Sequence, residues 1–124
     1  MLPASAAAGE IRLSQHSDWG NLTILLQDES QSGLQVLSGR GEWLNVPVVP
    51  GAFVINIGDL LARWTNDRWV STVHRVVSNG AGGERYSLPF FHQPNFDAVI
   101  ECIPTCATAD NPPRYEPVVS GPYL

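Results

Sequence analysis

The sequence has 124 residues and a mass of 13.5 kDa, which suits one compact domain rather than two. Hydrophobic residues make up 44% of the chain and charged residues 15%, a composition that excludes a disordered protein. Twelve acidic residues against seven basic ones give a net charge of −5. This balance argues against binding to a phosphate backbone, so we expect no nucleic-acid partner.

The ends of the chain and its cysteines carry little functional information. No apolar run approaches the roughly 18 to 20 residues that a membrane span requires, so we expect no membrane association. The alanine-rich segment 1–9 reads as a flexible lead-in. Cys102 and Cys106 do not form the C-x-x-C spacing of redox or zinc motifs, and two cysteines are not a disulfide framework. A cytoplasmic location is therefore predicted.

Short segments rich in β-branched and aromatic residues alternate with glycine, proline and asparagine along the whole chain. This pattern is typical of strands separated by tight turns. The regular spacing of the segments predicts an all-β sandwich or barrel. In chain order, the predicted strands are Glu10–Gln15, Leu22–Gln27, Leu34–Leu37, Trp43–Val48, Ala52–Ile57, Ser71–Val77, Arg85–Phe91 and Ala98–Ile103.

A few residues between the strands receive structural interpretations. Only Asp59–Trp64 has a helical pattern, with Asp59 as its candidate cap, and Asn66-Asp67 is a predicted turn. We interpret Asn56 as a strand end and Gly58 as part of a turn. The aromatic residues expected in the core are Trp43, Phe53 and Trp64.

Two histidines and one aspartate form the first candidate site. His16 and Asp18 are two residues apart at a strand boundary, where alternation in an extended chain points both side chains to one face. His74 lies in a strand dense in β-branched residues. Taken singly, such a histidine more often bonds a backbone carbonyl, and Asp18 is also a plausible turn residue. Together the three supply the two imidazoles and one carboxylate that hold non-haem Fe(II).

An arginine and a serine form the second candidate site. Arg85 and Ser87 share a face at the start of an apolar strand. A guanidinium beside a hydroxyl offers paired donors to a carboxylate, although a lone arginine at this position is more often solvated.

At this point the chain resembles the Fe(II) and 2-oxoglutarate-dependent oxygenases of the isopenicillin N synthase-like family. The resemblance extends from Gly9 to about Pro104. The motifs that carry it are His16-Ser17-Asp18-Trp19-Gly20, Leu22-Thr23-Ile24-Leu25-Leu26-Gln27-Asp28, Gly33-Leu34-Gln35-Val36, Gly41-Glu42-Trp43, Val49-Pro50-Gly51-Ala52-Phe53-Val54-Ile55-Asn56-Ile57-Gly58-Asp59, Trp64-Thr65-Asn66-Asp67, His74-Arg75-Val76 and Arg85-Tyr86-Ser87-Leu88-Pro89-Phe90-Phe91.

The resemblance implies an incomplete double-stranded β-helix, or jelly roll, with one short helix. It implies a barrel domain over residues 10–104 and an extended, proline-rich tail over 105–124. His16, Asp18 and His74 would hold Fe(II), and Arg85 and Ser87 would bind the distal carboxylate of 2-oxoglutarate. The implied activity uses O2 and couples oxidative decarboxylation of 2-oxoglutarate to hydroxylation, desaturation or ring closure of a small-molecule substrate.

The chain also departs from the family pattern. His16 comes almost at once, whereas family members carry a long portion before it, so we expect the isolated chain to expose a strand edge and to self-associate. Two alternatives stay open. One is an oxidase of the same fold that uses no 2-oxoglutarate, and the other is a catalytically silent metal-binding barrel. A zinc hydrolase is disfavoured because no H-E-x-x-H helix accompanies the histidines.

Overall fold

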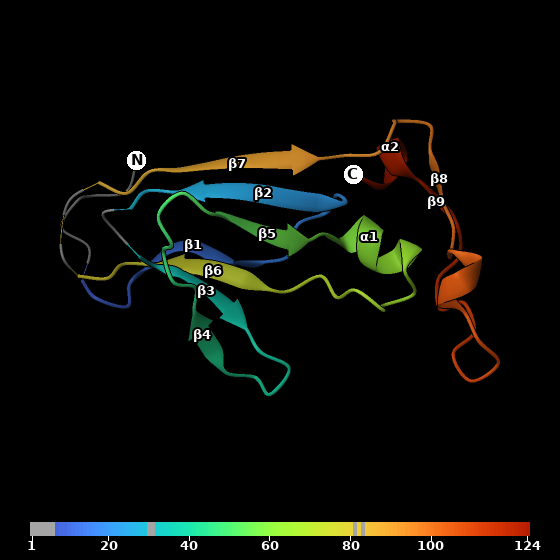
Figure 1. Cartoon of the computed structure of the whole chain (residues 1–124), viewed down its shortest axis with the longest axis horizontal. Helices are drawn as coiled ribbons and strands as arrows, with labels where there is room; N and C mark the ends of the chain where they lie inside the picture. Colours follow the sequence, from blue (N-terminus) through green and yellow to red (C-terminus); the bar gives the residue numbers. More distant parts are fainter. Residues whose placement is uncertain (1–6, 30–31, 81, 83) are drawn as a thin grey trace. The chain divides into compact units, whose positions relative to one another are not determined.

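The computed structural model describes residues 7–29, 32–80, 82 and 84–124, so most of the predicted lead-in over 1–9 lies outside the described residues. The described chain is mainly β (Figure 1). Its strands are β1 (Ile11–His16), β2 (Leu22–Gln27), β3 (Leu34–Leu37), β4 (Trp43–Asn45), β5 (Phe53–Ile57), β6 (His74–Val77), β7 (Ser87–His92), β8 (Val99–Ile100) and β9 (Val118–Val119). Its helices are α1 (Asp59–Trp64), the 3-10 turn η1 (Pro104–Cys106) and α2 (Ser120–Tyr123).

The chain forms two compact units. The first unit comprises residues 1–17, 25–54 and 72–89, and the second comprises 18–24, 55–71 and 90–124. Within the described ranges, no helix has the length and apolar character needed to cross a membrane.

A four-stranded sheet with the order β1-β6-β3-β4 lies in the first unit (Figure 1). Its strands pair in antiparallel fashion, with β6 between β1 and β3. The register of β1 on β6 shifts twice before it places His16 opposite His74. Such irregularities change the direction of a strand and of its side chains, and they are common beside functional sites.

A second sheet has the order β5-β2-β7, and β8 pairs with β9. All six residues of β7 are exposed. Phe53, at the start of β5, is 61% exposed, so the prediction that it lies in the core is wrong. It begins a strand whose alternate residues point to the more exposed face.

The predicted strands agree with the observed ones in their order along the chain. β2 and β3 have the predicted ends. β4 ends at Asn45 rather than at the predicted Val48, because Pro47 lacks the N–H that a strand ladder needs. β6 begins at His74 rather than Ser71, although Thr72 and Val73 favour a strand locally.

The predicted helix over Asp59–Trp64 is confirmed as α1, but Asp59 does not cap it. The N-cap is Gly58, and Asp59 is the first helical residue. Leu60 is fully buried and anchors the helix to the core of the second unit. A β-carbon added at Gly58 would lie 2.2 Å from the carbonyl oxygen of Gly20, so this close approach of two backbones requires glycine.

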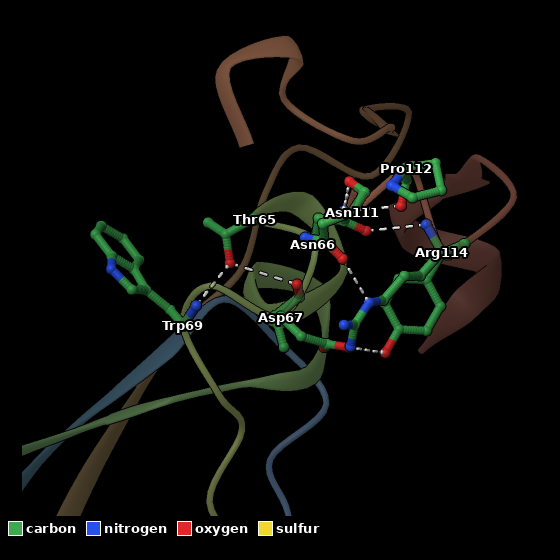
Figure 2. A network of polar contacts seen from close by, with 9 residues as sticks. Thr65, Asn66, Asp67, Trp69, Asn111, Pro112 and Arg114 are labelled. Carbon is green, nitrogen blue, oxygen red and sulfur yellow. Dashed lines mark hydrogen bonds and ion pairs between the residues drawn. The ribbon is translucent and has the colours of Figure 1, made fainter. Parts of the chain in front are cut away.

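The helix ends in a corner at Asn66 and Asp67, which both have positive φ, at 53° and 61°. Asn66 is only 2% exposed, and its amide is satisfied by the C-terminal segment (Figure 2). Its Nδ2 donates to the carbonyls of Asn111 (3.2 Å) and Pro112 (3.1 Å), and its Oδ1 accepts from the backbone N–H of Arg114 (2.9 Å). Asparagine suits this corner because it tolerates the left-handed conformation.

The C-terminal segment, expected to run extended, carries η1, β9 and α2. The structure therefore has a second short α-helix, α2, besides the single helix that was predicted. Arg63 contributes to holding this segment, because its Nη2 donates to the carbonyl of Glu116 (2.9 Å) and its guanidinium lies 4.7 Å from the centre of the Tyr115 ring. A hydrogen bond and a cation–π contact thus contribute to holding this segment.

Candidate metal centre and carboxylate site

His16 and His74 face each other across two neighbouring strands. His16 is the last residue of β1, His74 is the first residue of β6, and they are partners in the antiparallel register. Their ring centres are 4.3 Å apart, with the planes inclined by 56°. Residues directly opposite in an antiparallel pair bring their side chains together, which explains how positions 58 residues apart in sequence meet.

The same local hydrogen bond orients both imidazoles. Nδ1 of His16 lies 2.8 Å from the carbonyl oxygen of Ser14, and Nδ1 of His74 lies 3.0 Å from that of Thr72. A carbonyl oxygen only accepts, so Nδ1 carries the proton in each neutral ring. The lone pair is therefore on Nε2 in both histidines. A backbone bond of this kind fixes the tautomer and ring direction of a metal-binding histidine.

Asp18 completes a set of three possible ligands. One ligand atom from each of His16, Asp18 and His74 lies within 4.8 Å of the others. Two imidazoles and one carboxylate on one side of a metal leave further positions open, which is the arrangement that suits non-haem Fe(II). The three residues predicted from the sequence as one set are thus close together in the structure.

Two side chains donate to the same oxygen of Asp18. The amide Nδ2 of Asn56 lies 2.8 Å from Oδ2, and the hydroxyl of Thr23 donates to that oxygen as well. The backbone of Asp18 is held too, because its carbonyl accepts from the N–H of Asp59 at the start of α1 (2.7 Å). Both the side chain and the main chain of Asp18 are therefore fixed by surrounding donors.

Arg85 and Ser87 lie close together at the start of β7. Nη1 of Arg85 is 3.5 Å from the Ser87 hydroxyl, and Nη2 donates to Oε1 of Gln27 over 3.3 Å. Arg85 is partly buried, whereas Ser87 is exposed. Nε of Arg85 is buried and has no hydrogen-bond partner within the described parts of the chain. A buried N–H without a partner has a place for an acceptor.

The electrostatic surroundings of Arg85 disfavour its positive charge. Burial lowers the pKa of the Arg85 guanidinium, and the nearby charge of Arg12 lowers it further, while Asp28 acts in the opposite direction. Nε of Arg12 is likewise buried without a hydrogen-bond partner among the described residues. A partly buried guanidinium near a second positive charge favours an anion beside it, and both arginines have an Nε without a partner in the described chain. A carboxylate would supply both the negative charge and the acceptors.

The sequence interpretation missed four supporting residues, Thr23, Gln27, Asn56 and Arg12. Thr23, Gln27 and Asn56 are polar residues in otherwise largely apolar strand segments, such as Phe53-Val54-Ile55-Asn56-Ile57. That interruption is the signal that could have identified these three, since a polar group in such a place needs a partner. Arg12 lies in a strand of mixed polarity, β1, which carries no such signal. The sequence pattern indicates only a strand end at Asn56, but its side chain contacts Asp18.

Comparison with known proteins agrees with this geometry. The model of the 2OG-Fe(II) oxygenase superfamily matches residues 3–94. The 2-oxoglutarate-Fe(II) type oxidoreductase hxnY of Emericella nidulans is 50% identical over 107 residues, which are 86% of this chain and 30% of hxnY. The homoarginine-6-hydroxylase 2-ODD-C23 of Glycine max is 40% identical and matches 93% of this chain and 35% of its own. The chain spans about a third of the length of these curated relatives.

Solved structures match nearly the whole chain. A full-length Neurospora crassa protein crystallised in complex with alpha-KG has a TM-score of 0.85 and 42% identity, covering 94% of this chain and 39% of that protein. The rice dioxygenase for auxin oxidation has a TM-score of 0.86 and 31% identity, covering 96% of this chain and 42% of that protein. The predicted double-stranded β-helix, present in part, is confirmed. The family and the His-Asp-His set together imply Fe(II) and 2-oxoglutarate as cofactor and co-substrate.

Proposed function

Because the chain belongs to the 2OG-Fe(II) oxygenase superfamily, we propose that it forms the iron- and co-substrate-binding part of a dioxygenase acting on a small molecule. The reaction would couple oxidative decarboxylation of 2-oxoglutarate to hydroxylation, desaturation or ring closure. The observation that carries this proposal is the approach of the His16, Asp18 and His74 ligand atoms to within 4.8 Å of one another.

In this proposal, His16 and His74 bind Fe(II) through Nε2, and Asp18 binds it through a carboxylate oxygen. The backbone bonds at Nδ1 of each histidine keep the correct ring nitrogen unprotonated. The donor set fits Fe(II) because imidazole and carboxylate together suit this metal and three ligands leave positions open for exchangeable groups. When bound, the iron would supply the oxygen chemistry that no protein side chain provides.

Arg85 and Ser87 would bind the distal carboxylate of 2-oxoglutarate. The guanidinium can present two parallel N–H groups to the two carboxylate oxygens, and the hydroxyl can add a third donor. The buried Nε of Arg85 has no partner among the residues that the structure describes, and this supports the role because a carboxylate would satisfy it. Gln27 would keep the guanidinium in place through its bond to Nη2.

The substrate class is a small organic molecule. The Neurospora crassa relative was also solved with alpha-KG and thymine, and a curated relative from Glycine max is a homoarginine-6-hydroxylase. Thymine and homoarginine share little beyond small size and several polar groups. We therefore propose only that the substrate is a small organic molecule, since specificity within a fold depends on the site rather than on the fold.

The isolated chain would self-associate through the exposed edge at β7. Leu88 is 72% exposed and Phe90 is 61% exposed, and β7 is an outer strand of its sheet. An exposed apolar edge strand is a template for pairing with another chain. Light scattering after size-exclusion chromatography should give a mass above 13.5 kDa, and a Leu88→Lys variant should reduce it. A monomer at high concentration would contradict this expectation.

The proposed function can be tested by anaerobic titration of the Fe(II)-loaded chain with 2-oxoglutarate. We expect a weak visible charge-transfer band when the 2-oxo acid chelates the iron, and no band in a His16→Ala variant. Absence of the band in the wild-type chain despite bound iron would contradict co-substrate binding and favour either the oxidase that uses no 2-oxoglutarate or the silent barrel. Oxygen-dependent turnover without succinate would distinguish the oxidase.

A further inference from the structure

We propose that Thr23 and Asn56 are positioning residues that hold the Asp18 carboxylate so that it binds the metal through Oδ1 alone. The inference rests on the proposed function, because it assumes that Asp18 is a metal ligand. Thr23 and Asn56 are not among the three proposed metal ligands, so they would act on the metal only through Asp18.

Two donors occupy the lone pairs on Oδ2 of Asp18. A carboxylate oxygen has two acceptor positions, and Oδ2 of Asp18 receives hydrogen bonds from both the Thr23 hydroxyl and the Asn56 amide. With both positions used, Oδ2 is a poor metal ligand. Hydrogen bonds to an ionised oxygen are also stronger than neutral ones, so displacing either donor is costly. Coordination through Oδ1 retains both bonds.

The two donors come from neighbouring strands of one sheet. Thr23 lies on β2 and Asn56 on β5, and these strands are adjacent in one sheet. Thr23 is only 4% exposed, so its hydroxyl has little access to water and its bond to Asp18 is well protected. The sheet therefore sets the distance between hydroxyl and amide before any metal binds, which is what a positioning pair requires.

The consequence for the reaction is the number of coordination positions left open. Binding of the carboxylate through one oxygen would leave more positions of the metal open to exchangeable ligands than binding through both oxygens. In the proposed function, those open positions would serve the 2-oxoglutarate co-substrate. Thr23 and Asn56 would thus protect the co-substrate positions, not merely the affinity for the metal.

Thr23 offers a matched pair of variants. Thr23→Val keeps the shape and removes the hydroxyl, and Thr23→Ser keeps the hydroxyl and removes a methyl group. We expect Thr23→Val to weaken Co(II) binding about 10- to 100-fold, which is the usual effect of losing a group that orients a metal ligand, and Thr23→Ser to remain near wild type. Co(II) affinity is measured by competition with a chromophoric chelator.

Asn56→Ala should have an effect of the same size, and Asn45→Ala is its control. Asn45 is an exposed asparagine on β4 that bonds Gln35 and not Asp18. Because Thr23 and Asn56 act on one oxygen, the double variant Thr23→Val with Asn56→Ala should differ from the sum of the single effects. The d–d absorption of bound Co(II) should also change in intensity, which loss of stability alone would not cause.

The outcomes separate this inference from the proposed function. If His16→Ala abolishes Co(II) binding while Thr23→Val and Asn56→Ala bind as wild type with unchanged spectra, the positioning role is wrong and the metal site stands. If His16→Ala binds Co(II) as tightly as wild type, the metal site itself is wrong. Thermal melting of each metal-free variant gives the folded fraction, and a Thr23→Ser variant as weak as Thr23→Val would also overturn the inference.

Discussion

Asp18 and Arg85 differ in how far their hydrogen-bonding groups are already used in the structure. Asp18 receives two side-chain hydrogen bonds on one oxygen, and its carbonyl accepts a third bond from the start of α1. Arg85 has two long contacts, of 3.3 and 3.5 Å, and a buried Nε without a partner in the described part of the chain. One oxygen of the Asp18 carboxylate is thus already held by two donors, whereas Arg85 has a donor that an arriving acceptor could use.

The difference follows from what each group would bind. A resident metal ion requires ligands held in advance, because geometry determines which positions stay open. A co-substrate that enters and leaves in every cycle needs donors that it can satisfy itself, and a buried guanidinium gains most from an arriving carboxylate. The order of effects expected from substitutions follows from this contrast.

The largest effect is expected at the histidines. His74→Ala removes a ligand outright, so Fe(II) affinity should fall by more than the roughly 100-fold upper range for groups that only orient ligands. His92→Ala is the matched control, since His92 is exposed at the end of β7. The measurement is anaerobic competition with an Fe(II) chelator. Equal Fe(II) affinities in the two variants would remove His74 from the site.

Arg85→Ala should weaken 2-oxoglutarate binding by about 100-fold, since lost hydrogen bonds to a charged group amount to roughly 3 kcal/mol. Metal affinity should not change. Arg85→Lys should also be weak, because a single ammonium cannot reproduce two parallel N–H groups. Arg40→Ala, in an exposed turn, serves as the control. Calorimetric titration of the metal-loaded proteins measures the effect, and unchanged co-substrate affinity in Arg85→Lys would contradict the paired contact.

Gly58→Ala tests how far the support of Asp18 depends on close backbone packing. The added methyl group would clash with the carbonyl of Gly20, so we expect a loss of about 1–3 kcal/mol in the free energy of unfolding. Gly39→Ala is the control, because a β-carbon there meets nothing within 4 Å. Chemical denaturation gives both values. Equal stabilities would mean that the segment from Asp18 to Gly20 adapts easily.

The smallest effect is expected for Gln27→Ala. Gln27 is buried and holds one end of Arg85 through a 3.3 Å bond, so its loss should weaken 2-oxoglutarate binding by about 1 kcal/mol, or several-fold. Gln35→Ala is the comparison, because Gln35 bonds a different arginine, Arg75. Identical co-substrate affinities in the two variants would show that Arg85 needs no orienting partner.

The sequence by itself determined the succession of the first eight strands along the chain, the short helix over Asp59–Trp64 and the composition of the metal set. These features depend on local patterns: β-branched segments between turns, and a histidine and an aspartate two positions apart in an extended chain. The pairing of His74 with His16 was a hypothesis from residue types, and the resemblance to a known family assigned Arg85 and Ser87 to the co-substrate.

Only the tertiary structure decided which other groups support the site. The contact of Asn56 with Asp18 joins residues 38 positions apart, and the contact of Arg85 with Gln27 joins residues 58 positions apart. No local pattern encodes these contacts, because they depend on which strands become neighbours in the sheet. The prediction for Phe53 is wrong for the same reason: alternation shows that a strand has two faces, but packing decides which face is covered.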